Sequence, residues 1–324
     1  MRDGSADKPP TGPPGNPGII AAGTRREIVG LDLIKLPHRF RVTSGREFRL
    51  ADFDPGDTAG VRSRSEAPRY LAQGVERLRL LQEKLYAQDR WALLLVFQAM
   101  DAAGKDSIIK HVMSGLNPQG CQVHSFKAPS DEELDHDFLW RCAVRLPERG
   151  RIGIFNRSHY EEVLVVRVHP ELLARQRIPE PLTRGAIWRR RFEDIRAFER
   201  HLARNGTVIL KFFLNVSRTE QRQRFLERLD EPRKNWKFSA ADVAERHHWQ
   251  AYMEAYEEAI RHTAAEHAPW FVVPADHKWF TRLVVAEAVR SALETLDLRL
   301  PQPDAARREE LARARTQLEA EADD

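Results

Sequence analysis

A run of apolar residues followed directly by small residues and a lysine constrains most strongly how this chain can fold. Residues 91–97 read W-A-L-L-L-V-F, which has the length and composition of a strand buried on both faces. Residues 99–106 then read A-M-D-A-A-G-K-D, and a helical pattern begins near Lys105. Small residues let backbone N–H groups approach an anion, and the positive end of the helix dipole favours its charge. The segment therefore predicts a phosphate-binding loop.

The loop matches the P-loop pattern G-x-x-x-x-G-K-[ST] only in part. Ala99 replaces the first glycine, Asp106 replaces the Mg²⁺-binding hydroxyl, and Ser107 comes one position later. Asp101 would repel bound phosphates unless a cation lies between them, so we expect it to bind a metal ion or act as a base. The alternative is a buried strand with an ordinary turn and helix. The residues expected to contact phosphate are Ala102, Ala103, Gly104, Lys105, Asp106 and Ser107.

Length and composition limit the class of protein. A chain of 324 residues can form one large α/β domain or two smaller ones. Its net charge of +4 is only mildly basic for this size, which argues against a general coat for nucleic acid. Cys121 and Cys142 lack metal-site spacing and are expected to be reduced core thiols. No apolar run approaches the roughly 20 residues that span a bilayer, and the N-terminus lacks the hydrophobic core of a signal peptide, so we expect a soluble cytoplasmic protein with no membrane partner.

The rest of the chain alternates between strand and helix patterns. Further strands are expected at 121–126, 151–155, 207–215 and 269–274, and helices at 68–85, 184–205, 217–229, 239–266 and 279–296. This alternation predicts an α/β fold whose parallel sheet is covered by helices on both faces. The Pro/Gly-rich residues 1–24 are expected to be a disordered tail, 25–300 the catalytic domain, and 301–324 a charged tail that is frayed helix or disordered.

Two polar segments near predicted strand ends are candidates for function. Asn156 and Arg157 follow the strand at 151–155, where a polar side chain can hold a metal and an arginine can bind two phosphoryl oxygens. An ordinary polar loop is the alternative. Ser130 and Glu133 have the spacing of a capping box, which competes with a functional role for Glu133.

Positive charge is concentrated in one part of the chain. Residues 184–237 contain fifteen Lys or Arg against seven Asp or Glu, a larger excess than the net charge of the whole chain. Solvated helix faces often carry charge, but an imbalance of this size favours a polyanionic partner.

Four motifs together resemble the polyphosphate kinase 2 family, P-loop enzymes that use inorganic polyphosphate as phosphoryl donor. They are A-M-D-A-A-G-K-D (99–106), H-V-M-S-G-L-N-P-Q-G (111–120), F-N-R-S-H-Y-E-E-V-L (155–164) and E-Q-R-Q-R-F-L-E-R-L-D-E-P-R-K-N-W-K-F-S (220–239). The resemblance covers residues 31–296. It implies a P-loop kinase-like three-layer sandwich with a central parallel sheet of about five strands and a basic helical lid at about 217–247.

The resemblance also implies roles for individual residues. Asp101 would bind Mg²⁺ (or Mn²⁺) or help to activate the acceptor phosphate, Lys105 would neutralise phosphate, and Arg157 would contact the transferring group. Some members have Asp at the second metal position, where this chain has Asn156. The lid residues that would close over polyphosphate or nucleotide are Arg224, Arg228, Lys234 and Lys237.

The form of the motifs resembles the subgroup that accepts both nucleoside mono- and diphosphates. The residues that would contact the nucleotide are Asn117, Glu133 and His159, and Glu133 could accept a hydrogen bond from the adenine amino group. The expected partners are polyphosphate, adenine nucleotides, with guanine nucleotides as further candidates, and a second copy of the chain in a dimer or tetramer. Nucleic acid is not expected to be a partner.

Two other functions remain open at this point. One is an ATP-dependent nucleoside monophosphate kinase of thymidylate-kinase type, which shares the fold and the P-loop. The other is a polyanion- or nucleic-acid-binding module built on the basic segment. Asp101 argues against a binding module, because a carboxylate in an anion site weakens anion binding.

Overall fold

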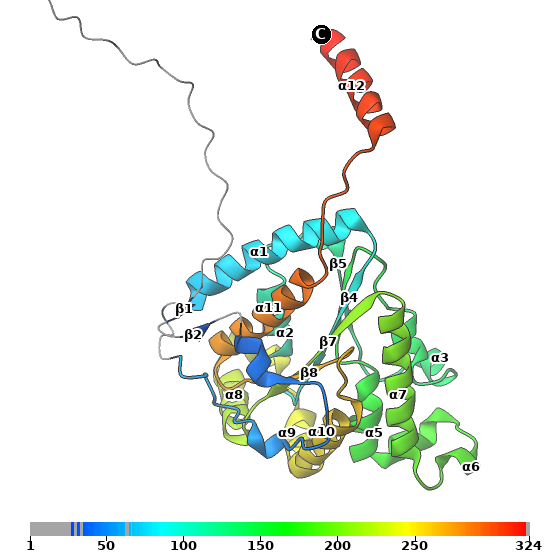
Figure 1. Cartoon of the computed structure of the whole chain (residues 1–324). Coiled ribbons are helices and arrows are strands. Elements are labelled where there is room, and N and C mark those ends of the chain that lie inside the picture. The colour runs from blue at the N-terminus through cyan, green and yellow to red at the C-terminus, as the bar shows by residue number, and fades with distance from the viewer. Residues whose placement is uncertain (1–26, 29–30, 33–34, 62–64, 66, 322–324) are drawn as a thin grey trace, which may run out of the picture.

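A six-stranded sheet forms the centre of the computed structural model (Figure 1). The structure describes residues 27–28, 31–32, 35–61, 65 and 67–321, so the expected N-terminal tail at 1–24 lies outside the described residues. The strands, in spatial order, are β3 (Arg41–Val42), β8 (Trp270–Pro274), β7 (Thr207–Asn215), β4 (Ala92–Gln98), β6 (Ile152–Asn156) and β5 (Cys121–Ser125). A separate two-stranded sheet pairs β1 (Glu27–Ile28) with β2 (Leu31–Asp32).

The prediction of a parallel sheet is confirmed. β4 pairs in parallel with β6 and β7, and the ladder continues in parallel to β5 on one side and β8 on the other. β3 adds a short antiparallel edge to β8. The sequence did not predict β3, because a two-residue strand is too short to show any periodicity.

Helices cover both faces of the sheet (Figure 1). One layer contains α1 (Ala67–Gln88), α2 (Lys105–Val112) and α11 (Lys278–Glu294), and the other contains α5 (Val165–Val168), α7 (Ile187–Arg204) and α10 (Trp249–Thr263). The remaining helices are α3 (Asp131–Leu134), α4 (Trp140–Ala143), α6 (Glu180–Thr183), α8 (Arg218–Asp230), α9 (Ala240–Glu245) and α12 (Ala305–Ala320). Short 3₁₀ helices are η1 (Leu36–Phe40), η2 (Leu50–Asp52), η3 (Pro118–Gly120), η4 (His159–Val163), η5 (Pro170–Gln176), η6 (Pro232–Lys237) and η7 (Arg246–His248).

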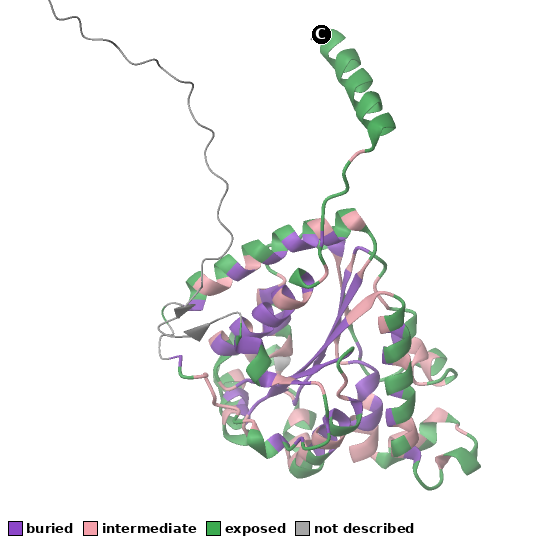
Figure 2. Ribbon diagram, viewed as in Figure 1, coloured by how far each residue is buried: buried purple, intermediate pink, exposed green. Residues whose placement is uncertain are grey.

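The central strands are buried because both of their faces carry helices. All seven residues of β4 are buried, as are all five of β8 (Figure 2). This explains why these strands read as continuous apolar runs and not as alternating patterns. The charged C-terminal segment forms α12, which is exposed throughout and projects from the body in Figure 2. Among the described helices, none has both the length and the hydropathy that crossing a bilayer requires.

One predicted helix is interrupted. The pattern at 239–266 is divided into α9, η7 and α10. At the break, Arg246 Nη1 donates to Gln221 Oε1 at 2.5 Å, and the next residue back, Glu245, accepts from Tyr252 OH at 2.8 Å. The contact with Gln221, which belongs to α8, joins the break to a distant segment, whereas the local sequence favours one continuous helix.

A buried ion pair joins the sheet to the helix layer. Lys211, in the middle of β7, is completely buried, and its Nζ donates to Glu199 Oε2 at 2.7 Å, to Tyr160 OH at 2.9 Å and to Thr263 O at 2.9 Å. Tyr160 OH donates in turn to the other oxygen of Glu199 at 2.7 Å. All three ammonium donors therefore have partners inside the core, which a buried charge requires.

Replacing Lys211 should destabilise the fold strongly. Lys211→Met leaves the Glu199 carboxylate buried without its counter-charge, and we expect the free energy of unfolding to fall by about 3–5 kcal/mol. Urea denaturation followed by circular dichroism measures this change. Lys211→Met with Glu199→Gln should be less destabilised than the single variant, and Lys110→Met, at an exposed position of α2, should change stability by about 0.5 kcal/mol or less. A Lys211→Met protein as stable as Lys110→Met would show that Glu199 does not depend on its counter-charge.

Candidate active site

A cavity of about 560 Å³ opens at the carboxyl ends of β4 and β6, beside the loop between β4 and α2. Six cationic side chains and four carboxylates line it. The cations are Lys105, Arg157, Arg224, Arg228, Lys234 and Lys278, and the carboxylates are Asp101, Asp106, Glu227 and Asp242. The excess of positive charge makes this cavity, here called the phosphate cavity, suited to a polyanion.

The loop has the backbone geometry of an anion site. Ala102 and Gly104 both have left-handed backbones, with φ of 60° and 108°, and α2 begins at the next residue, Lys105. Lys105 Nζ donates to Ala99 O at 2.7 Å. Burial lowers the pKa of Lys105, and the positive charge of Arg157 lowers it further. A phosphate bound at the loop would supply the counter-charge that this ammonium needs.

Arg157 lies at the end of β6, where two carboxylates hold its guanidinium. Nη2 bonds Asp101 Oδ1 at 2.9 Å, and Nη1 lies 3.4 Å from Glu161 Oε2. Burial acts to lower the pKa of Arg157, but Glu161 and Asp101 outweigh burial and raise it above its usual value. The residue has a left-handed backbone with φ of 63°, and its N–H bonds Phe97 O at 3.0 Å. Such strain in a residue other than glycine is typical of functional sites.

Glu161 is a site residue that the sequence patterns did not identify. Glu161 Oε1 accepts a hydrogen bond from Gln98 Nε2 at 3.0 Å, so the carboxylate is fixed from behind while it orients Arg157. Its position four residues after Arg157 is the only sequence signal that could have indicated it. The structure also brings together Asp101, Lys105 and Arg157, as the sequence predicted.

The residues around Asp106 fit a magnesium ion that retains part of its water shell. Asn156 Nδ2 donates to Asp106 Oδ1 at 2.7 Å, and Ser107 Oγ accepts from Arg282 Nη2 at 3.1 Å. The described residues contain no group of three or more His, Cys, Asp or Glu side chains that could hold a metal. Mg²⁺ is usually bound through one or two carboxylates together with substrate phosphates and water. Asp101 and Asp106, which both line the cavity, meet that requirement.

Arg224 holds the loop in place, contrary to the expectation that it closes over polyphosphate. It is only 4% exposed, and its Nε donates to Glu220 Oε1 at 2.8 Å. The other four contacts are with the backbone oxygens of Ala102 (3.1 Å), Ala103 (2.7 Å), Ala275 (2.6 Å) and Asp276 (3.1 Å). All five N–H donors of the guanidinium are therefore occupied by protein oxygens. The role of Arg224 is to support the loop.

The lid segment, residues 217–247, supplies the outer wall of the phosphate cavity. Arg228 lies 3.7 Å from Asp242, and Lys234 forms an ion pair with Glu231. Arg228 and Lys234 line the cavity as predicted, whereas the side chain of Lys237 lies outside the described part of the structure. Asp242, Trp236 and Lys278 also line the cavity and were not predicted.

A second, smaller pocket of about 230 Å³ adjoins the phosphate cavity, and Arg157 lines both. Its apolar wall includes Pro129, Leu134, Phe138, Val165, Val166 and Leu172. His159 also lines this apolar pocket but is only 3% exposed; neither ring nitrogen has a hydrogen-bond partner among the described residues, and Nε2 lies 3.7 Å from Glu199 Oε1. Both nitrogens are buried and do not face the open space of the pocket.

Glu133 and Asn117 were both expected to contact the nucleotide, but the structure places only Glu133 at a cavity described above. Glu133 lines the apolar pocket, and it also completes the predicted capping box with Ser130 and lies 3.3 Å from Arg141. Asn117 is not among the described residues that line either cavity. It precedes β5, at the amino end of the parallel strands, and its side chain accepts from Gln119 N at 3.0 Å. The expected contact between Asn117 and the nucleotide is therefore wrong, because Asn117 lies at the amino ends of the parallel strands and the phosphate cavity lies at their carboxyl ends.

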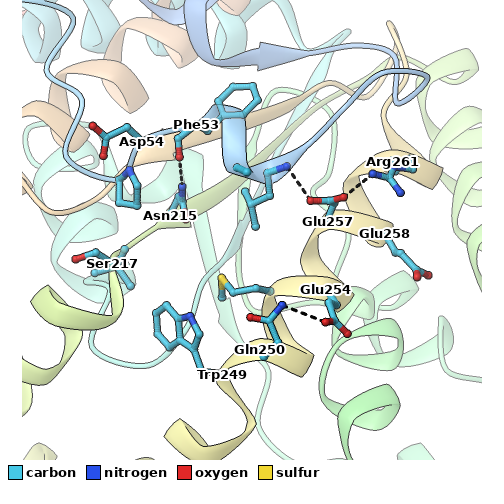
Figure 3. A pocket seen from close by; sticks show the side chains of 15 residues that line it. Phe53, Asp54, Asn215, Ser217, Trp249, Gln250, Glu254, Glu257, Glu258 and Arg261 are labelled. Atoms are coloured by element: carbon cyan, nitrogen blue, oxygen red, sulfur yellow. Dashed lines mark hydrogen bonds and ion pairs between the residues drawn. The ribbon is translucent and has the colours of Figure 1, made fainter.

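A more spacious cavity of about 760 Å³ has the wrong charge for phosphate (Figure 3). It lies between residues 50–55, the end of β7 and α10. Its charged lining consists of Asp54, Glu254, Glu257, Glu258 and Arg261. In Figure 3, Glu257 bonds Arg261, and Asn215 Nδ2 donates to Phe53 O at 2.8 Å. Its excess of carboxylates excludes it as a site for an anion chain.

Replacing Arg224 by lysine should test its support of the loop. A lysine has three donors, so at least two of the five oxygens lose a partner, and we expect the free energy of unfolding to fall by about 2–4 kcal/mol. Chemical denaturation measures the loss. Arg228→Lys is the matched control, because the described contact of Arg228 with Asp242 is a single pair at 3.7 Å, and it should change stability by about 0.5 kcal/mol or less. Equal effects of the two substitutions would refute the structural role.

Comparisons with known proteins identify the family of this chain. Residues 62–301 match the family model of polyphosphate kinase 2. A relative from Rhodopseudomonas palustris named ADP-polyphosphate phosphotransferase is 52% identical over 281 residues, 86% of this chain and 97% of the relative. A relative from Meiothermus ruber named AMP/ADP-polyphosphate phosphotransferase is 46% identical over 269 residues, with coverage of 83% and 97%. The crystal structure of polyphosphate kinase 2 from Arthrobacter aurescens TC1 superposes with a TM-score of 0.77 at 42% identity, covering 86% of this chain and 96% of that chain. The chain belongs to the polyphosphate kinase 2 family.

Proposed function

We propose that this chain transfers a phosphoryl group from inorganic polyphosphate to AMP and ADP. The observation that carries the proposal is the position of Arg157, which lines both the cationic phosphate cavity and the apolar pocket. A polyanionic donor in the first and a nucleoside in the second would meet at this guanidinium. The names of the two relatives from Rhodopseudomonas palustris and Meiothermus ruber support the same reaction class.

The reaction needs positioning and charge neutralisation more than covalent chemistry. An oxygen of the acceptor phosphate attacks a phosphorus atom of polyphosphate, the P–O bond to the rest of the chain breaks, and that oxygen leaves with the electron pair. Lys105 and the loop N–H groups would hold the donor, and Arg157 would hold the transferring group in a bidentate contact. Asp101 and Asp106 would bind Mg²⁺ or Mn²⁺, which when bound neutralises phosphate charge.

The acceptor would lie with its nucleoside in the apolar pocket. His159 lines this pocket, and Glu133 offers a carboxylate to an amino group of the base. Adenine and guanine both carry an exocyclic amino group, so both purines are proposed acceptors. A neutral Asn156 repels an additional phosphate less than a carboxylate would, which suits acceptors with one or two phosphates. A dimer or tetramer remains a proposal carried over from the family.

The purified protein should make ATP from AMP with polyphosphate as sole donor. Incubation with AMP, Mg²⁺ and polyphosphate, free of adenylate kinase, should yield ADP first and ATP later, because one site would serve both acceptors. Separation of the nucleotides over time measures this order. Inert AMP beside active ADP would restrict the enzyme to diphosphate acceptors.

Asp101→Asn and Lys105→Met are the controls for this assay. Each removes one positioned charge and should lower kcat by about 10²–10³-fold, while circular dichroism shows an unchanged fold. Near-normal turnover in both variants would remove Asp101, Lys105 and their loop from the mechanism.

Charge reversal in the lid segment should affect polyphosphate more than AMP. Arg228→Glu with Lys234→Glu changes two residues that line the phosphate cavity, so KM for polyphosphate should rise and its dependence on salt should weaken, because a long polyanion contacts many cations. KM for AMP should change little. Arg222→Glu with Arg233→Glu alters the same net charge at exposed lid positions and should have a smaller effect. Equal effects of the two double variants would contradict a polyphosphate site in this cavity.

A further inference from the structure

Trp236 lines the phosphate cavity, and most of the surface of this residue is exposed to solvent. It is 78% exposed, the highest fraction among the large hydrophobic residues of the described structure. Trp236 belongs to the short helix η6 together with Lys234, and both residues line the cavity. Tryptophan carries a large, flat apolar surface, so an exposed indole in the wall of a cavity offers a face on which a ligand can pack.

The chemistry of an indole does not suit polyphosphate. Polyphosphate has charged oxygen atoms but no ring. The cations Lys105, Arg228 and Lys278 of the same cavity are suited to bind those oxygens. The flat face of an indole stacks on nucleobases, and such stacking is tolerant of base identity. A ligand that uses both the cations and the indole combines a phosphate chain with an aromatic base. That ligand is a nucleotide.

The cavity is large enough for such a ligand. Its volume of about 560 Å³ falls within the range of pockets that enclose small molecules and cofactors. The loop at Gly104 and Lys105 lies within this cavity, as does Trp236 in the lid segment. Because the loop, Arg228, Lys234 and Trp236 line the same cavity, one nucleoside triphosphate can contact the cations with its phosphates and the indole with its base.

We propose that the phosphate cavity also binds a nucleoside triphosphate in place of polyphosphate, with its base stacked on Trp236. This inference rests on the proposed function, in which the same cavity holds the polyphosphate donor. It makes ATP, the product of the reaction, a competitor of polyphosphate. The acceptor nucleoside in the apolar pocket is a separate ligand, because Trp236 is not among the described residues that line that pocket.

The test compares two inhibitors that differ by a nucleoside. ATP and inorganic triphosphate are each titrated into the reaction of polyphosphate with saturating AMP, at several polyphosphate concentrations. For the unchanged protein, both should compete with polyphosphate. Trp236→Ala should raise the inhibition constant of ATP by about tenfold, the effect of losing one stacked base, and should leave that of triphosphate within about twofold. Trp236→Phe should restore most of the ATP inhibition.

Controls separate this inference from its alternatives. Leu229→Ala, at another exposed apolar residue of the lid segment, should leave both inhibition constants unchanged. Equal changes for ATP and triphosphate, or a rise in KM for AMP that matches the change for ATP, would overturn the stacking site. A shift in oligomeric state of Trp236→Ala, measured by light scattering, would assign the indole to an interface and would also overturn it. Absence of any turnover with polyphosphate in the unchanged protein would instead refute the proposed function.

Discussion

The contact between Arg224 and the phosphate loop supports the rest of the site. One guanidinium joins α8, the carbonyls of Ala102 and Ala103, and the turn after β8. Because these carbonyls point toward Arg224, the loop keeps a left-handed residue, Ala102, that alanine alone would disfavour. Arg224 thus connects the loop to the first helix of the lid segment, whose Arg228 also lines the cavity.

The charges around Arg157 balance one another. Arg157 lies between Asp101 and Glu161, so its charge is largely compensated before a substrate arrives. A fixed guanidinium loses little conformational freedom when it binds phosphate, and its two carboxylate partners keep its donors oriented. Burial and the charge of Arg157 lower the pKa of Lys105 in the same environment, and an anionic ligand would act in the opposite direction. In the proposed function, these two cations are in place for phosphate before it binds.

Local patterns predicted the strands and most helices well, because parallel strands buried on both faces are apolar without interruption. They also predicted the capping box at Ser130 and the proximity of Asp101, Lys105 and Arg157, since carboxyl ends of neighbouring parallel strands meet at one edge. Patterns failed where distant segments decide the outcome. The helix pattern at 239–266 is interrupted where Arg246 contacts α8. Asn117 was expected to contact the nucleotide but lies at the amino ends of the parallel strands, away from the phosphate cavity.

The sequence by itself determined the α/β class, the strand–loop–helix segment that ends in α2 and the family resemblance, because these depend on the order and spacing of residues along the chain. Only the tertiary structure decided what individual cations do. Arg224 and Arg228 are four residues apart on one helix, look alike in the sequence and both line the cavity. Arg224 is buried with all five of its N–H donors bound to protein oxygens, whereas Arg228 lies 3.7 Å from Asp242. The tertiary structure also placed Glu161 behind Arg157 and Trp236 in the wall of the phosphate cavity. Burial and acceptor geometry arise from segments far apart in the chain, and no local pattern encodes them.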